Sequence, residues 1–196
     1  MEEKINLKNI IKFVNLLNKF RQVERVIHSN GEDRMENDVE HSYQLAMLSW
    51  YIISTNNLNL NLDLILKYSL VHDLVEVYAG DTYVYTEDAE HKNTKEERES
   101  IALDQISEEF SEFPIFELIK EYEKKENREA RFVYALDKIE PILNIYTNNG
   151  RTWKEKNISI QMMIDAKRKN ISKFPELLEF FDDIINLLKK EEKDLW

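Results

Sequence analysis

Apolar residues recur three and four positions apart along most of the chain, which is the spacing of one face of a helix. The first such stretch covers residues 6 to 28 and predicts one long helix or two collinear helices. A polar loop at residues 29 to 37 then leads into a helix that carries His41. A further helix is expected from Leu62 to Gly80, because glycine commonly ends a helix.

The second half of the chain shows the same periodicity. The expected helices are a charged one opening at Lys95, one from Ile115 to about Lys125, one from about Arg128, and two amphipathic ones at residues 153 to 173 and 176 to 190. Pro141 lies within the helix from Arg128 and predicts a kink or a local break there. With only three glycines and three prolines, the chain has little material for turns, which favours long helices joined by short loops.

These patterns predict an all-α fold, a bundle of roughly seven to nine helices. A length of 196 residues is typical of a single domain and is long enough for a substantial core. We therefore expect one domain over residues 1–196, with its functional core at about residues 10–150. The helices at residues 153–190 are expected to pack on that core.

Composition and charge narrow the classes of function. The 42% hydrophobic and 33% charged residues fit a soluble globular protein. A net charge of −11 argues against sequence-independent binding of nucleic acid, and it means that a phosphate site would need a metal and local basic groups. The chain has no cysteine, and neither a signal peptide nor a membrane-spanning run is found, so a cytoplasmic protein without a membrane partner is expected.

The densest group of chemically useful side chains lies near the end of the helix that stops at Gly80. His72 and Asp73 are adjacent, Glu76 lies four positions after the histidine on the same flank, and Asp81 follows the glycine. Side chains of neighbouring helical residues point about 100° apart. His72 and Asp73 can therefore bind the same ion only if it lies between their two directions, in a groove against other helices. The pair therefore predicts further ligands elsewhere in the chain.

Two other residues are candidates for those ligands. His41 is expected in the first turn of its helix, because Asn37 and Glu40 have the spacing of a capping box. Asp137 lies at the edge of a buried helical face, where an unpaired carboxylate is costly. A cation fits best there, and a salt bridge to Lys138 or an arginine is the alternative. Two imidazoles and two carboxylates suit one divalent Mn, Fe, Co, Ni or Zn ion.

The order of His41, the pair His72-Asp73 and Asp137 resembles that of the HD-domain metal phosphohydrolases. The fuller strings ENDVEHS, VHDLVEVYAGD and ALDKIEP are similar to the branch that includes the bacterial 5′-deoxynucleotidases and their HDDC-type relatives. The similarity covers roughly residues 10 to 150. It implies a homodimeric enzyme that hydrolyses nucleoside 5′-monophosphates, with deoxyribonucleotides preferred, to nucleoside and inorganic phosphate.

The resemblance also implies roles for individual residues. Glu76 would orient or deprotonate the attacking water, or protonate the leaving oxygen. Asp81 would position the substrate or take part in acid–base catalysis. Arg25 would hold the phosphate through its planar fork of donors. Lys95 and Arg98 resemble basic groups that face the phosphate, although alternating charges on a helix are usually a solvated face.

Some features leave alternatives open. The resemblance implies a tryptophan near the sugar at the position after Arg25, but this chain has Val26 there. The resemblance therefore does not decide whether the substrate contains ribose or deoxyribose. Residues 82 to 93 lack periodicity and are either a lid over the site or a mobile surface loop, in which His91 is interpreted as a surface histidine.

Two other functions also remain possible. One is an HD phosphohydrolase that acts on a triphosphate, a cyclic nucleotide or another phosphoester. The other is a non-catalytic scaffold that binds a nucleotide or a protein. The presence of both Glu76 and Asp81 favours an enzyme, because a pure binding module has no need of them.

Overall fold

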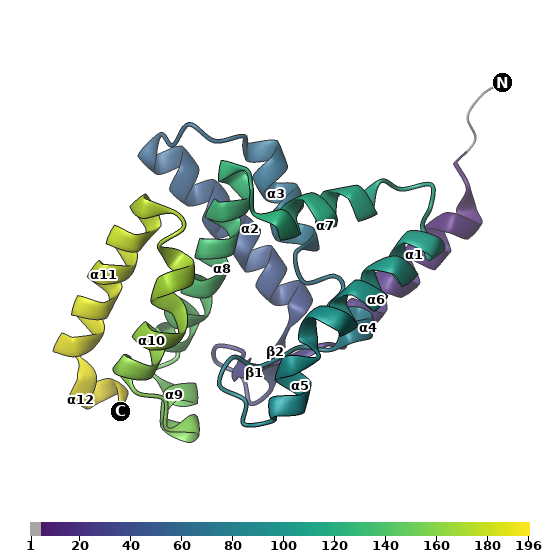
Figure 1. Ribbon diagram of the computed structural model, residues 1–196. Coiled ribbons are helices and arrows are strands. Elements are labelled where there is room, and N and C mark those ends of the chain that lie inside the picture. The colour runs from purple at the N-terminus through teal and green to yellow at the C-terminus, as the bar shows by residue number, and fades with distance from the viewer. Residues whose placement is uncertain (1–4) are drawn as a thin grey trace.

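The computed structural model describes residues 5–196 (Figure 1). This part of the chain contains twelve helices and two short strands. The eight helices of ten or more residues are α1 (Leu7–Phe20), α2 (Asp38–Asn56), α3 (Leu62–Val71), α6 (Lys95–Glu109), α7 (Ile115–Lys124), α8 (Arg128–Thr147), α10 (Ile160–Ile171) and α11 (Pro175–Lys190). The short ones are α4 (Glu76–Ala79), α5 (Ala89–Asn93), α9 (Arg151–Lys156) and α12 (Glu192–Leu195). The predicted helical fold is confirmed. Among residues 5–196, no helix combines the length and apolar composition needed to cross a bilayer.

Two groups of buried apolar side chains form the core. The larger lies among α2, α3, α8, α10 and α11, and its most enclosed members include Tyr68, Phe132, Leu136 and Phe181. The smaller lies among α1, α4, α6 and the start of α7. Figure 1 shows the corresponding division, with α8, α10 and α11 on the left and α1, α4 and α6 on the right. Helix α8 buries a stripe that includes Phe132, Leu136 and Ile139, and it contacts α2, α3, α7, α10 and α11.

The first predicted helix is too long. Helix α1 ends at Phe20, and residues 24 to 28 form strand β1 (Glu24–His28), which pairs antiparallel with β2 (Met35–Asn37). The apolar residues in this short stretch fit the spacing of a strand as well as that of a helix. The strand with which it pairs, β2, lies in the segment that was predicted to be a polar loop. The hairpin matters for the site because it places Arg25 on a strand rather than on a helix face.

The helix predicted from Leu62 to Gly80 is also interrupted. Helix α3 stops at Val71, and the amide hydrogen bonds of Leu74, Glu76 and Val77 reach back three residues instead of four. This tighter winding separates α3 from α4 and carries the His72-Asp73 pair between them. Gly80 ends α4 with φ of 75°, as its position predicted.

The C-terminal region contains one helix break that was not predicted. Residues 153 to 173 form two helices, because Asn157 adopts a left-handed conformation with φ of 54° and Ser159 caps the start of α10. Pro141 does not break α8, which continues to Thr147. Helix α9 is held against the C-terminus, where Trp196 stacks on Trp153 with ring centroids 4.8 Å apart.

Gly150 should be essential to that C-terminal packing. It has φ of 70°, and a Cβ there would overlap the main-chain carbonyl of Leu195. We expect Gly150→Ala to lower the free energy of unfolding by about 1 kcal/mol through left-handed strain. Displacing the C-terminus should cost a further 1–3 kcal/mol or so. Urea unfolding, followed by tryptophan fluorescence, measures the loss.

Gly31→Ala is the matched control. Its φ is 77°, and no atom lies within 4 Å of the added Cβ, so it carries the backbone strain without the overlap. Equal losses for the two variants would show that the contact with Leu195 contributes nothing.

Candidate active site

The capping box predicted at the start of α2 fixes the position of His41. The Asn37 side chain accepts hydrogen bonds from the amides of Val39 and Glu40, both at 3.1 Å. The Glu40 carboxylate in turn accepts the Asn37 amide at 3.1 Å. Both halves of the motif are present, so the prediction is confirmed and the first turn of α2 is rigidly defined. His41 lies in that turn and is fully buried.

The four predicted metal ligands converge from three separate elements. Asp137 Oδ1 lies 3.1 Å from His41 Nε2, and Asp73 Oδ2 lies 3.0 Å from His72 Nε2. The two Nε2 atoms are 3.3 Å apart. One donor atom from each of the four residues lies within 4.8 Å of all the others. The helices α2 and α8 and the turn after α3 thus bring the predicted set together.

Both imidazoles are held in the tautomer that a metal requires. His72 Nδ1 donates to the main-chain carbonyl of Ser69 at 3.0 Å. His41 Nδ1 donates to Glu140 Oε2 at 2.9 Å. With the hydrogen on Nδ1, each ring directs the lone pair of its Nε2 atom toward the other ligands. A positive charge between the two Nε2 atoms, whether a metal ion or a proton, is the natural complement of this arrangement.

The spacing of the donors fits a divalent ion. Bonds of about 2.1 Å place adjacent ligands about 3.0–3.4 Å apart in octahedral or tetrahedral coordination. Three of the separations between the donors, from 3.0 to 3.3 Å, lie in that range, and two further histidine–aspartate separations are 3.8 Å. His41, His72, Asp73 and Asp137 are therefore suited to hold one metal ion.

Electrostatics also favour positive charge at this point. Burial opposes charging of the His72 ring, yet the neighbouring Asp73 and Asp137 carboxylates raise its pKa to about 10. Burial likewise opposes ionisation of Asp137, but Lys138 and the two imidazoles hold the pKa of that carboxyl well below its usual range. The carboxylates are thus kept as anions, in the form that binds a metal.

Arg25 reaches this centre from β1. Its Nη1 atom donates to Asp73 Oδ2 at 2.8 Å and to Asp38 Oδ1 at 3.2 Å, and its Nε atom lies 3.7 Å from Glu36 Oε1. Asp38 and Glu36 are buried, so they hold the guanidinium beside a metal ligand. The arginine also lines the adjacent cavity.

Glu76 stands in the same cavity as an incompletely bonded carboxylate. The side chain is buried, and its Oε2 atom has no hydrogen-bond partner within the described residues. Burial, reinforced by the nearby Asp73 carboxylate, raises the pKa of Glu76 well above its usual value. Lys95 is the nearest cation, with Nζ 3.9 Å from Glu76 Oε1. A carboxyl with raised proton affinity and a free oxygen is suited to proton transfer.

The loop after α4 brings Asp81 to the cavity wall, together with residues 82–85. Burial raises the pKa of the Asp81 carboxyl. Arg98 is not part of the wall. It donates to the carbonyl of Ala79, to Thr82 Oγ1 at 2.8 Å and to the carbonyl of His91 at 3.0 Å, so it holds the loop in place. Of the three predicted substrate-binding residues, the structure brings Arg25 and Lys95 to the cavity.

His91 is not the surface histidine that the sequence suggested. It is half-buried, and its Nε2 atom lies 3.1 Å from the main-chain carbonyl of Asp81. The ring thereby connects α5 to the beginning of the loop.

The cavity encloses about 990 Å³ when the space open to solvent is counted. At one end lie Arg25, Asp73, Glu76, Asp81, Lys95 and Asp137; the other end is lined mainly by apolar side chains of α8, α9 and α10. Val26 also lines the wall. A polar end and an apolar end within one cavity suit a ligand that has the same two parts.

Several residues of the site were not predicted from the sequence to have a role there. Glu36 and Asp38 stand within the string that contains His41, and Glu140 lies three positions after Asp137, so local spacing offered some signal for these three. Lys138 donates to Asp137 Oδ2 at 2.6 Å, so the salt bridge expected as the alternative to a cation is present as well. Lys167 belongs to α10, far along the chain, and no local motif indicated it.

Known proteins resemble this chain in sequence. The 5′-deoxynucleotidase HDDC2 of Mus musculus is 32% identical over 139 residues, which cover 68% of this chain and 67% of that protein. HDDC2 of Homo sapiens is 31% identical over 141 residues, which cover 69% of this chain and 66% of that protein. The chain thus spans about two-thirds of the length of these relatives. HDDC2 of Dictyostelium discoideum is 28% identical over 175 residues, with 83% of this chain and 90% of that protein covered.

A solved structure agrees with this grouping. The crystal structure of a protein from Magnetospirillum magnetotacticum MS-1, described as a predicted metal-dependent phosphohydrolase, matches with a TM-score of 0.78 and 26% identity over 95% of this chain and 96% of that one. The family model of the HD domain matches residues 17–178, which include all four predicted metal-binding residues. The chain therefore belongs to the HD-domain family.

Proposed function

We propose that this protein is a metal-dependent phosphomonoesterase that hydrolyses nucleoside 5′-monophosphates, with deoxyribonucleotides preferred, to nucleoside and inorganic phosphate. The observation that carries the proposal is the convergence of four potential metal-binding donors beside a cavity that also contains Arg25, Glu76 and Lys95. The curated relatives named 5′-deoxynucleotidase support the choice of substrate class.

One divalent ion, such as Mn, Co, Fe, Ni or Zn, would be held by His41, His72, Asp73 and Asp137. Once bound, such an ion lowers the pKa of a water molecule and offsets charge on the phosphoryl group. A mixed nitrogen and oxygen donor set accommodates several of these metals, so it does not select one.

Arg25 and Lys95 are the groups that hold the phosphate in this proposal. The Arg25 guanidinium is anchored by Asp38, which leaves its planar fork directed beside the metal ligands. Lys95 adds a second positive charge, held at 2.6 Å by Glu99 on the next turn of α6. Arg98 contributes indirectly, because its hydrogen bonds position the loop that begins at Asp81.

Glu76 accepts a proton from the attacking water, since its free oxygen and raised pKa suit a general base. The phosphorus–oxygen bond to the nucleoside then breaks, and the 5′ oxygen takes up a proton. Asp81 lies at the start of the loop and lines the cavity. There it positions the leaving nucleoside or supplies the proton that the 5′ oxygen takes up.

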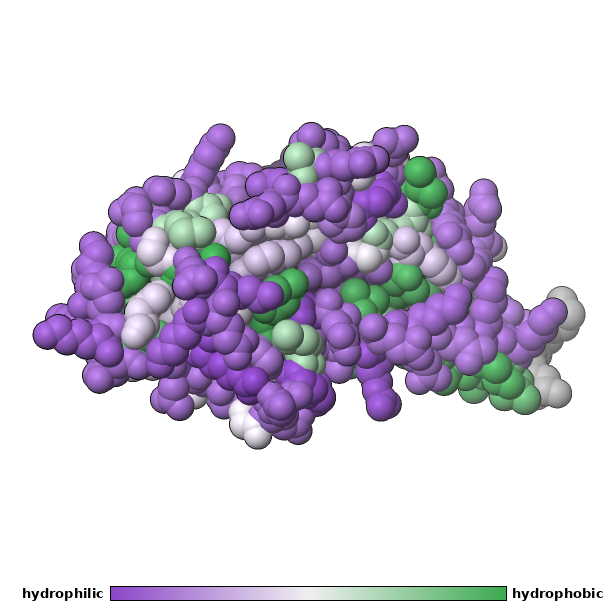
Figure 2. Space-filling view, turned by 90° about the horizontal axis from the view of Figure 1, so that it is seen from below, coloured by the Kyte–Doolittle hydropathy of each residue, from purple (hydrophilic) through white to green (hydrophobic). Residues whose placement is uncertain are grey.

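We further propose that the protein is a cytoplasmic homodimer that acts on free nucleotides. Helix α1 exposes an apolar stripe made of Leu7, Ile10, Ile11, Val14 and Leu17. Figure 2 shows a green area at the lower right, on the side where Figure 1 places α1. An exposed stripe of this kind is typical of a surface that is covered by a protein partner.

Phosphate release from a panel of nucleotides tests the proposed function. The protein is stripped of metal and refilled separately with Mn, Co, Zn or Mg, then given deoxyribo- and ribonucleoside 5′-monophosphates. We expect metal-dependent release from the 5′-monophosphates, faster with deoxyribose, and none from 3′-monophosphates. Absence of release with every metal, despite a bound ion, would move the function to another phosphoester or to a binding role.

Asp137→Asn should abolish metal binding and activity together. The substitution keeps the size of the side chain but removes an anionic ligand, and loss of a direct ligand should exceed the roughly 10–100-fold cost of losing an outer-shell partner. Metal content after dialysis against a chelator measures the effect. Asp104→Asn, at an exposed position on α6, is the matched control. Normal metal content in Asp137→Asn would exclude this residue as a ligand.

Glu76→Gln should separate binding from turnover. Because Glu76 is not among the four ligands, the variant should retain metal and a near-normal KM, whereas kcat should fall by about 10²–10⁴-fold. Glu108→Gln changes an exposed glutamate on α6 and should leave both constants unchanged. An unchanged kcat in Glu76→Gln would mean that another group removes the proton.

A further inference from the structure

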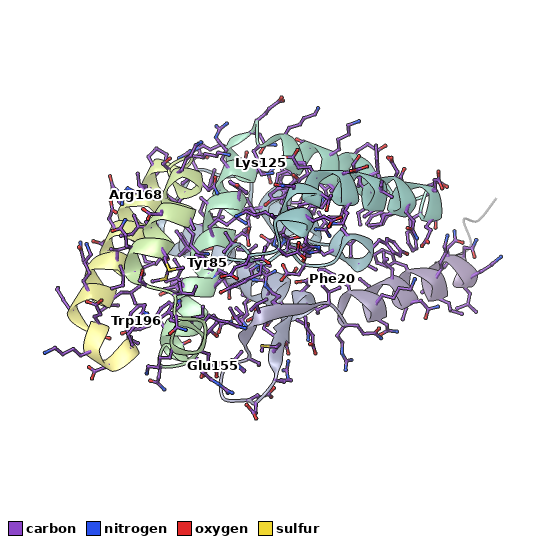
Figure 3. The ribbon with its side chains drawn as sticks, turned by 60° about the horizontal axis from the view of Figure 1, so that its bottom comes forward. Phe20, Tyr85, Lys125, Glu155, Arg168 and Trp196 are labelled. Atoms are coloured by element: carbon purple, nitrogen blue, oxygen red, sulfur yellow. The ribbon has the colours of Figure 1, made fainter. Side chains whose placement is uncertain are left out.

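Helix α10 brings to the cavity a lysine that the proposed reaction does not use. Lys167 lines the cavity, whereas the next residue, Arg168, is exposed and donates to Asp182 of α11 at 3.0 Å. Figure 3 shows Arg168 at the upper left, on the outside of the molecule, and Tyr85, another residue that lines the cavity, near its middle. Neighbouring helical residues point about 100° apart, so Lys167 lies on the inner side of α10.

The Lys167 ammonium is buried and has few partners. The residue is 8% exposed, and its Nζ atom donates one hydrogen bond, to the main-chain carbonyl of Lys138 at 3.0 Å. An ammonium group has three donors and no acceptor, so two N–H groups lack a partner among residues 5–196. A buried donor without a partner is costly, and a ligand that accepts from it removes that cost.

The bond to Lys138 places the ammonium at the metal end of α8. Lys138 follows the predicted ligand Asp137 in the chain and pairs with it, Nζ to Oδ2, at 2.6 Å. Burial lowers the pKa of Lys167 to about 8, and the nearby charges of Lys138 and Arg25 act in the same direction. The carboxylates of Asp137 and Glu140 act against this shift. All four of these charged groups belong to the metal centre or contact its residues.

Each of the other cations that line the cavity forms an ion pair with a carboxylate. The pairs are Arg25 with Asp73 at 2.8 Å, Lys95 with Glu99 at 2.6 Å, and Lys138 with Asp137 at 2.6 Å. Within the described part of the chain, Lys167 forms no ion pair, and its one bond is to a neutral carbonyl. A buried charge without a counterion is costly, so an anion in the cavity would stabilise it.

We propose that Lys167 is a third phosphate-binding cation, beside Arg25 and Lys95, and that it makes the site select phosphomonoesters over phosphodiesters. The inference rests on the proposed nucleotidase function. A phosphomonoester carries about 1.5 to 2 negative charges near pH 7, whereas a phosphodiester carries one. Arg25 and Lys95 share their charge with carboxylates, so the second negative charge of the substrate is met by the cation that shares with none.

A purely structural role for Lys167 does not account for its charge. A neutral donor could make the same bond to the Lys138 carbonyl at a lower cost of burial. The ammonium instead lines the cavity among the charged groups of the metal centre. A cation buried at this cost is explained by an anionic ligand, and the phosphate is the anionic part of the proposed substrate.

Thymidine 5′-monophosphate and its methyl phosphate ester test this selection, because they differ by one methyl group and one negative charge. In Lys167→Gln the amide can still donate to the Lys138 carbonyl, but the charge is lost. We expect the KM for thymidine monophosphate and the inhibition constant of inorganic phosphate to rise by about tenfold or more, as for loss of a hydrogen bond to a charged group. The inhibition constant of the methyl ester should rise much less, and the metal content should not change.

Lys169→Gln is the matched control, since it removes an exposed lysine from the same helix and should leave all of these constants unchanged. Lys167→Arg keeps the positive charge and should keep the preference for the monoester, so it tests the proposal independently should Lys167→Gln fail to fold. Unchanged constants in Lys167→Gln, or an equal rise for the monoester and the methyl ester, would overturn the proposal.

Failure of the proposed function gives a different result. If no nucleotide is hydrolysed with any metal, calorimetric titration of thymidine monophosphate and its methyl ester into the metal-loaded protein still measures the selection. Tighter binding of the monoester that depends on Lys167 would support the proposal. Equal affinity for the two ligands, or an undiminished preference in Lys167→Gln, would contradict it.

Discussion

Two imidazole nitrogens, one from α2 and one from the residue that ends α3, face each other across 3.3 Å with a carboxylate oxygen close to each. Because Glu140 and Ser69 accept the Nδ1 hydrogens, both Nε2 atoms face the centre, where a metal ion or a proton can bind. Such an arrangement is stable when positive charge lies between the donors. The rest of the fold is organised to maintain it: a capping box fixes α2, a tight turn follows α3, and α8 supplies Asp137 and Glu140 from one face.

The local charge of the site differs from that of the whole protein. The net charge of −11 opposes the approach of a phosphate, but screening confines exposed charges to a range of about 8 Å at physiological salt. Within that range the anion would meet Arg25 and Lys95, and the carboxylates of Asp73 and Asp137 would be neutralised by the metal they hold. Binding of an anionic substrate by an acidic protein is therefore governed by a few groups at the polar end of the cavity.

Sequence reasoning succeeded where a local pattern carries the information. The capping box before His41, the spacing of His72, Asp73 and Glu76, and the position of Asp137 beside a core stripe each depend on a few neighbouring residues. It failed where a distant partner decides the structure. Residues 24 to 28 form a strand because residues 35 to 37 pair with them. The tight turn after Val71 carries the pair His72-Asp73, whose side chains contact residues of α2 and α8.

The same distinction explains why Lys167 and Tyr85 lack a signature in the sequence. Each is an ordinary residue of its own segment, and only the fold brings the loop after α4 and helix α10 to one wall. The burial of Lys167 and the lack of a partner for the Tyr85 hydroxyl within the described residues are properties of the assembled structure.

Helix α8 connects the two ends of the cavity and sets the distance between them. Asp137, Pro141, Ile142 and Ile145 all line the wall, at the spacing of one helical face. Eight residues separate the first from the last, or about 12 Å along the axis. Because α8 continues through Pro141 without a break, this separation is fixed by a rigid element. One rigid helix therefore carries Asp137 at the polar end of the cavity and part of the apolar wall at the other end.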